Sequence, residues 1–186
     1  MTGWWGMPAL SSNNRKTLLE LARKSIAAHL ETGNPLNFQT SDAELCLKRG
    51  CFVTLRKHGT LRGCIGTFDT SEPLYQHVIR MSAASAFQDT RFSPVTKSEL
   101  VDLRIEISVL GPLEKVSSAE EIEIGRHGVY VKRGAKSGTF LPEVAVEQHW
   151  GPAEFVNGCA REKAFLTPAE LPFAEILRYE VEKFSE

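Results

Sequence analysis

The chain has 186 residues, with 22 basic and 23 acidic side chains and a formal net charge of −1. This length suits one domain, or one domain of two lobes, whose core needs neither disulfides nor metals. The balanced charge disfavours nucleic-acid binding driven by electrostatics, and no apolar run reaches the roughly 20 residues of a membrane helix. The first residues lack the pattern of a secretory signal, so we expect a cytoplasmic protein with no membrane contact.

Cysteine spacing excludes the common metal and redox motifs. The four cysteines, which show neither C-x-x-C nor zinc-ribbon spacing, are Cys46, Cys51, Cys64 and Cys159. A reducing compartment would keep them as thiols. We expect no bound metal and no cofactor. Residues 1–14 are predicted to form an N-terminal lead, whose Trp4 and Trp5 dock on the domain or, alternatively, stay flexible.

The first predicted element is an amphipathic helix over residues 15–31. Asn13 or Asn14 can cap its start, and Gly33 ends it. Apolar side chains recur on one face at helical spacing: Leu18, Ala22, Ile26 and Leu30.

A β-hairpin is predicted next, from CFVTLRK (residues 51–57) and TLRGCIG (residues 60–66). In the first segment Cys51, Val53 and Leu55 alternate with Phe52, Thr54 and Arg56, which is typical of a strand. The short link between the segments contains a glycine. With a period of two, Arg62 and Cys64 share one face of the second strand, and Gly63 faces the other way.

A second helix is predicted to start at Pro73, with Ser71 or Glu72 as its cap. Its end, residues 82–86, consists of small side chains, which lets a helix approach a sheet closely. A glycine on the facing strand allows the same approach from the other side. We therefore predict that Gly63 packs against residues 82–86.

The second half of the chain continues with paired strands separated by helices. Thr96 and Glu99 form a capping-box pattern, the alternating strand LRIEISVL follows, and a hairpin with a basic tip lies near residues 127–141. The last run, AEILRYEVEKFSE, fits a strand better than a helix. Strands in pairs predict an α+β fold with mixed or antiparallel sheets and packed helices. The predicted helical segments before the last run are EVAVEQHW, PAEFVNGCAREKAF and TPAEL.

The segment LRGCIG, residues 61–66, carries the most specific chemistry. Arg62 can lie near Cys64, and a nearby cation favours the thiolate, which is the reactive form of cysteine. Gly63 and Gly66 leave room for a ligand or for another backbone. These features fit a nucleophile or a ligand-binding surface. The alternative is a small core cysteine, with Arg62 paired to a carboxylate.

Further candidates lie beyond this segment. Asp89 and Arg91 can bind an anion or transfer a proton, or they form a salt bridge that fixes their loop. Glu106 lies on the polar face of its strand, facing either solvent or a cleft shared with Cys64. Of the histidines, only His127 is kept as a candidate. The basic hairpin tip lacks the P-loop spacing, so a solvated hairpin end is favoured over a phosphate site.

Four ordered blocks resemble the AMMECR family, which includes the bacterial AmmeMemoRadiSam system protein A. LRGCIG is similar to the signature hexapeptide of this family, within the longer block GCFVTLRKHGTLRGCIGTF. AFQDTRFSPVTKSEL, IEISVL and HGVYVKRGAKSGTFLPEVAVEQHW resemble the other blocks. The similarity extends over nearly the whole chain after Asn14. Two departures are Cys51, where alanine is frequent, and EKAFL in place of K-A-G-L, which removes the glycine of a turn after Lys163.

The resemblance implies an α+β domain over residues 15–186, made of two intertwined lobes that form a cleft near the signature. It implies no settled activity. The name of the bacterial system makes a Memo-like protein and a radical SAM protein candidate partners. The residues that match family motifs are Arg62, Gly63, Cys64, Gly66, Asp89, Arg91, Phe92, Glu106, Leu141, Pro142 and Glu147.

Three functions stay open on the sequence. The first is a small-ligand-binding protein or cysteine-dependent enzyme that takes an anionic small molecule into the cleft. The second is an interaction module in which LRGCIG is structural. The third, least favoured, is nucleic-acid binding through the basic hairpin tip. Under the first, the predicted catalytic residues are Cys64, Glu106 and Asp89. The predicted ligand-binding residues are Arg62, Gly63, Gly66, Arg91, His127 and Glu147.

Overall fold

A computed structural model describes residues 9–186, so the expectation for Trp4 and Trp5 lies outside the described residues. The chain divides into two compact units. The first unit comprises the described residues up to Leu110 together with Glu182–Glu186, and the second comprises Gly111–Val181. Helices and antiparallel strands in both units confirm the α+β class. The cleft stays a prediction.

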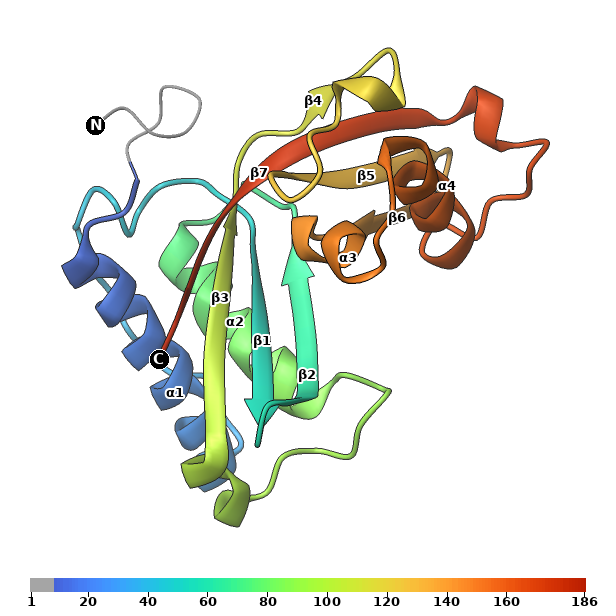
Figure 1. Ribbon diagram of the computed structural model, residues 1–186. Helices are drawn as coiled ribbons and strands as arrows, with labels where there is room; N and C mark the ends of the chain where they lie inside the picture. Colours follow the sequence, from blue (N-terminus) through green and yellow to red (C-terminus); the bar gives the residue numbers. More distant parts are fainter. Residues whose placement is uncertain (1–8) are drawn as a thin grey trace. The chain divides into compact units, whose positions relative to one another are not determined.

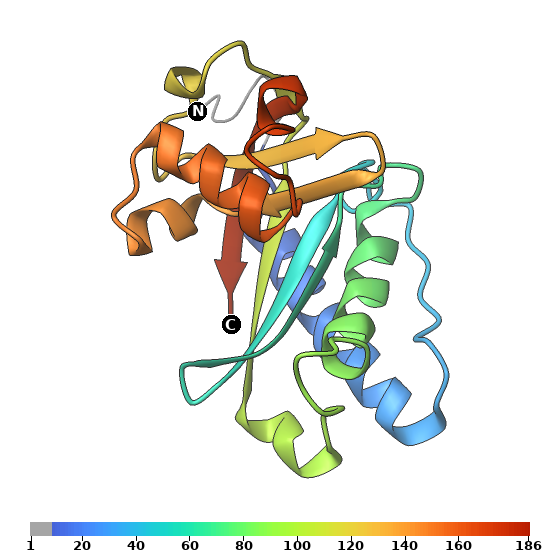
Figure 2. The ribbon, with the colours of Figure 1, turned by 90° about the vertical axis from the view of Figure 1, so that its right-hand side faces the viewer.

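The first unit contains three antiparallel strands in the order β2-β1-β3, with two helices on one face (Figures 1 and 2). The residues of β1 and β3 on that face are buried, as the alternation predicts, and pack against apolar side chains of the helices. The elements in chain order are α1 (Ser12–Thr32), β1 (Cys51–Lys57), β2 (Thr60–Thr67), α2 (Leu74–Phe87), the 3₁₀ helix η1 (Lys97–Asp102) and β3 (Leu103–Leu110).

Helix α1 is confirmed, although its predicted cap is wrong. Ser11 caps the helix by accepting a hydrogen bond from the backbone N–H of Asn14. The Asn14 side chain is buried and donates instead to Asp42 and Glu44. Gly33 ends the helix in the left-handed conformation, with φ of 73°.

A β-bulge interrupts the pairing of β1 with β2. The pairs on either side of it are Leu55 with Gly63 and Arg56 with Leu61. Arg62 is therefore the extra residue, with no partner on β1. The bulge interrupts the regular alternation of side chains between the two faces of β2. The prediction that Arg62 and Cys64 share one face therefore loses its basis.

The predicted packing of Gly63 against α2 is confirmed. A side chain at Gly63 would overlap the backbone of Ser85, which lies within residues 82–86. The Ser85 hydroxyl donates to the carbonyl oxygen of Val53 at 2.8 Å and accepts from the N–H of Ile65 at 2.9 Å. Gly63 thus lets α2 lie directly on the hairpin, where the Ser85 hydroxyl bonds to both strands.

The second unit is built on the antiparallel neighbours β6-β5-β7, with β4 also paired to β7. Its helices cover a separate apolar core. The last run of the chain is a strand, as predicted, whereas TPAEL is a turn that leads into a short 3₁₀ helix. The elements are β4 (Glu114–Lys115), η2 (Ala119–Glu121), β5 (His127–Arg133), β6 (Lys136–Phe140), α3 (Pro142–Glu147), α4 (Pro152–Glu162), η3 (Leu171–Phe173) and β7 (Glu175–Ser185), whose residues from Glu182 onward belong to the first unit.

Phe165 occupies a left-handed backbone position, with φ of 52°, and is 75% exposed. It is the residue that replaces glycine in the K-A-G-L pattern. Because a bulky residue is disfavoured there and the ring buries little surface, Phe165→Gly should raise the free energy of unfolding by about 1 kcal/mol. Chemical denaturation measures the change. The control is Phe173→Gly, equally exposed but in η3, which should lower stability. Equal effects of the two changes would contradict the prediction.

Candidate functional site

Cys64 belongs to a row of side chains across the first unit's sheet. Thr54 on β1 is paired with Cys64 on β2 and with Glu106 on β3. The Thr54 hydroxyl donates to the sulfur of Cys64 at 3.2 Å, and the cysteine is half-buried. Two strand spacings, about 10 Å, separate the backbones of Cys64 and Glu106. Glu106 is therefore not placed to take a proton directly from the thiol.

Glu106 is held by two cations. One carboxylate oxygen accepts from Arg56 at 3.0 Å, and the other lies 3.3 Å from the ammonium group of Lys183. The side chain is 14% exposed. The predicted cleft position on the sheet face is thus occupied by an ion-pair network, and a catalytic role for Glu106 stays a prediction.

Asp89 connects the loop after α2 to the backbone of Cys64. Its buried carboxylate accepts from the Cys64 N–H at 2.9 Å and binds Arg91 in bidentate fashion at 2.9 and 2.7 Å. The Arg91 guanidinium lowers the pKa of Asp89 to about 2. At neutral pH the carboxylate is ionised and is a weak base. The geometry therefore supports a positioning role more than proton transfer.

Arg91 is the cation next to Cys64. Its Nη2 donates to the Cys64 carbonyl oxygen at 3.2 Å, and its guanidinium carbon lies 5.5 Å from the ring centre of Phe92. The side chain is 51% exposed, and within residues 9–186 its Nη1 has no hydrogen-bond partner. We call Thr54, Cys64, Asp89, Arg91 and Phe92 the Cys64–Arg91 surface.

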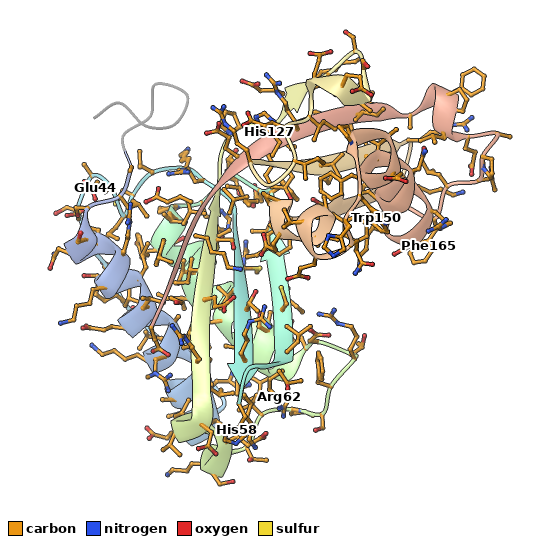
Figure 3. All side chains as sticks on the ribbon, in the orientation of Figure 1. Glu44, His58, Arg62, His127, Trp150 and Phe165 are labelled. Carbon is orange, nitrogen blue, oxygen red and sulfur yellow. The ribbon has the colours of Figure 1, made fainter. Side chains whose placement is uncertain are left out.

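Arg62 lies near His58 at the tip of the hairpin (Figure 3), where other protein groups bind its guanidinium. It donates to both carboxylate oxygens of Glu99, at 3.0 and 3.1 Å, and to the carbonyl oxygens of Ser93 and Pro94. The side chain is 13% exposed. Glu99 also accepts from Lys57, and these cations hold its pKa well below the usual range. This matches the alternative interpretation, in which Arg62 pairs with a carboxylate.

Glu99 also completes the predicted capping box. Its carboxylate accepts from the backbone N–H of Thr96 at 3.0 Å, at the start of η1. The Glu99 carboxylate thus accepts hydrogen bonds from the backbone at the start of η1 and from two basic side chains. The bulge and this carboxylate together explain why Arg62 is not the cation of the Cys64–Arg91 surface.

The two glycines of the signature provide close packing within the protein. Gly63 makes room for the backbone of α2, and a side chain at Gly66 would overlap the ring of Phe52. Both close approaches are therefore to protein atoms. A role of either glycine in ligand binding stays a prediction.

His127 and Glu147 belong to the second unit. His127 is buried, and its Nδ1 accepts from the N–H of Glu123, so its Nε2 carries the hydrogen. Burial lowers the pKa of His127, which keeps the ring neutral. Glu147 is the exposed last residue of α3. A role of His127 or Glu147 in a binding site stays a prediction.

The basic hairpin tip is paired locally. Lys132 lies 3.5 Å from Glu175, and Lys136 lies 2.9 Å from Glu170. Arg133 stacks on the ring of Phe173 at 5.2 Å. These partners reduce the attraction of the tip for phosphates, so nucleic-acid binding remains the least favoured hypothesis.

Sequence reasoning missed Thr54, which touches the sulfur directly. Its position opposite Cys64 follows from the strand register, and the bulge hides this register in the sequence. In the part of the chain that the structure describes, no group of three or more histidine, cysteine or acidic residues could hold a metal ion. None of the described helices is long and apolar enough to cross a membrane.

The structure defines an α+β protein in which a half-buried thiol lies beside a buried carboxylate and a half-exposed arginine. Residues 19–184 match the family model of AMMECR1, and the chain belongs to this family. It is 40% identical to protein MK0488 of Methanopyrus kandleri over 180 residues, which cover 91% of the chain and 86% of MK0488. The crystal structure of PH0010 from Pyrococcus horikoshii matches with a TM-score of 0.88 and 33% identity, over 95% of this chain and 93% of PH0010.

Proposed function

We propose that the protein binds a small anionic molecule at the Cys64–Arg91 surface, with the thiol of Cys64 in contact with the ligand. The observation that carries this proposal is the state of Arg91. Its Nε and Nη2 atoms donate to the buried carboxylate of Asp89. The guanidinium is nevertheless half-exposed, and its Nη1 still has N–H groups to donate. A fixed guanidinium of this kind is suited to a carboxylate or phosphate.

The contact with Cys64 makes two activities compatible with this surface. The Thr54 hydroxyl points a hydrogen toward the sulfur, and a donated hydrogen bond of this kind favours the charged form of its acceptor. The thiol can therefore act as a polar contact for the ligand or as a nucleophile toward it. Both activities require a reducing compartment, and we propose the cytoplasm.

Alkylation tests both the thiol and the anion site. Iodoacetate carries a carboxylate and iodoacetamide does not, so the ratio of their rates measures the local attraction for an anion. We expect this ratio to be roughly fivefold higher at Cys64 than at the half-buried Cys46, because one cation close by contributes about 1 kcal/mol. Peptide mass spectrometry measures each rate. Cys51 and Cys159 should react least, since burial raises the pKa of each to about 12.

The control for this experiment replaces one arginine at a time. Arg91→Gln should bring the rate ratio at Cys64 down to that at Cys46, whereas Arg104→Gln, at an exposed position on β3, should leave it unchanged. A Cys64 that is inert to both reagents from about pH 6 to 9 would exclude the thiol contact. An unchanged ratio in Arg91→Gln would exclude the anion site.

The second candidate is an interaction module that binds a Memo-like or radical SAM protein. It is favoured by the structural use of Arg62, Gly63 and Gly66, since half of the six-residue signature serves internal contacts. Co-purification of either partner from a reconstituted mixture, retained in Arg91→Gln, would support this candidate over the first. Loss of co-purification in the absence of any unfolding would assign the Cys64–Arg91 surface to the partner.

A further inference from the structure

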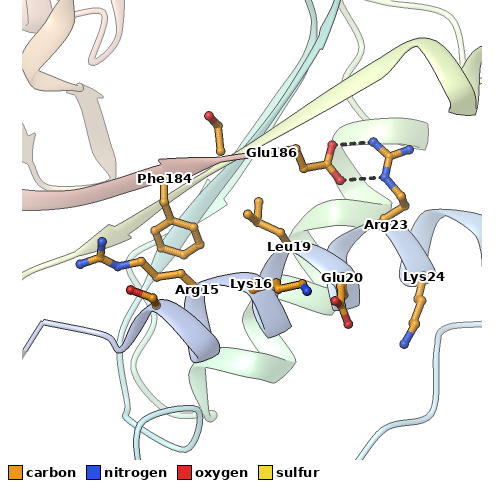
Figure 4. A pocket seen from close by; sticks show the side chains of 10 residues that line it. Arg15, Lys16, Leu19, Glu20, Arg23, Lys24, Phe184 and Glu186 are labelled. Atoms are coloured by element: carbon orange, nitrogen blue, oxygen red, sulfur yellow. Dashed lines mark hydrogen bonds and ion pairs between the residues drawn. The ribbon is translucent and has the colours of Figure 1, made fainter.

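A groove of about 570 Å³ runs along α1 in the first unit and shares no residue with the Cys64–Arg91 surface (Figure 4). One wall is a stripe of α1 from Ser12 to Lys24, and the other is the end of the chain, Phe184–Glu186. Small-molecule sites typically enclose about 300–1,000 Å³. The groove is therefore large enough for one small ligand.

The floor of the groove is apolar. Leu19 and Phe184 are half-buried, and both pack against the core of the first unit. The aliphatic stems of Arg15 and Arg23 add apolar surface beside them (Figure 4). Such a floor favours an apolar ligand body over a polar one.

The rim of the groove carries an excess of positive charge. Arg15 is paired with Glu182 at 2.9 Å, and Arg23 is paired with Glu186. Lys16 and Lys24 are exposed, and neither has an ion pair within the described part of the chain. In a chain of net charge −1, this local excess points to an anionic group on the ligand. The charged lining residues are Arg15, Lys16, Arg23 and Lys24 against Glu20 and Glu186.

We infer that the groove binds a small amphipathic anion, with its apolar body on Leu19 and Phe184 and its carboxylate at Lys16. Lys16 and Leu19 are three residues apart, so they are neighbours on the helix surface. Lys24 lies two turns from Lys16, about 12 Å along the axis, and attracts the anion only at longer range. The ligand class is a short acyl or aryl carboxylate.

The test uses octanoate, with octanol and octylammonium as matched neutral and cationic probes. Titrations followed by amide chemical shifts should show octanoate binding, with shifts at α1 and Phe184–Glu186. Lys16→Gln should weaken binding about fivefold, Lys24→Gln less, and Lys97→Gln, at an exposed site outside the groove, not at all. Arg91→Gln should leave the octanoate-induced shifts of the groove residues unchanged, which separates this inference from the proposed function.

Three results would overturn the inference. The first is the absence of shifts in the groove at millimolar octanoate. The second is equal binding of octanol and octanoate, because it removes the need for an anion. The third is a set of groove shifts that follow protein concentration without any probe, because the occupant would then be a second copy of the chain.

Discussion

Gly63→Ala is expected to lower the free energy of unfolding by about 3 kcal/mol. The added methyl group would overlap the carbonyl oxygen of Ser85 in the backbone of α2, so a helix or a strand must shift. A shift would also disturb the two hydrogen bonds of the Ser85 hydroxyl, which donates to the carbonyl oxygen of Val53 and accepts from the N–H of Ile65. Urea denaturation of the purified variant measures the loss.

The matched control is Gly151→Ala. Gly151 has a φ of −79°, and an added methyl group there would make only an ordinary contact, at 3.6 Å from Glu154. We expect a change below about 1 kcal/mol for this variant. If both variants lost the same stability, the close approach of α2 to the hairpin would not be the cause.

The stability of the protein should depend on the ionisation of Asp89. The pKa of this carboxyl is about 2 in the folded protein against 3.8 in the unfolded chain. A lowered pKa in the folded state means that the carboxylate stabilises the fold above about pH 4 and loses this contribution as the pH falls toward 2. The contribution at neutral pH is about 2 kcal/mol.

Asp89→Asn should therefore be less stable than the parent protein by about 2 kcal/mol at pH 7, and the difference should shrink as the pH approaches 2. Denaturation curves at several pH values measure this difference. The matched control is Asp102→Asn, at an exposed position, which should change stability little at any pH. A difference that stays constant down to about pH 2 would show that the carboxylate charge is not what stabilises the loop.

Local patterns were sufficient to predict much of the fold. The hairpin around Gly59, helix α1 and the capping box of Thr96 with Glu99 depend on residues close in sequence, and each was found where expected. The contact of Gly63 with α2 was also predicted, because small residues on both sides leave few other uses for a glycine in a strand. The predicted cap of α1 was wrong because Asn14 has stronger partners from a distant loop.

The candidate site was less predictable, since it depends on register and on distant partners. A bulge of one residue removes Arg62 from the regular pairing, and no local pattern in LRGCIG indicates it. Glu99, which binds Arg62, lies 37 residues away in sequence. The role of Arg91 follows from its bond to Asp89, two residues earlier, but the link of that pair to Cys64 appears only in three dimensions.

Strand β2 is the outer strand of the first unit's sheet, and outer strands offer unpaired amides to neighbouring molecules. Here both outward backbone groups of Cys64 are bonded, since its N–H donates to Asp89 and its carbonyl oxygen accepts from Arg91. These side chains therefore cover the edge of the sheet near the thiol and oppose pairing with a strand of another molecule there. The hydrogen bonds that position Cys64 thus also oppose aggregation through the edge of the sheet.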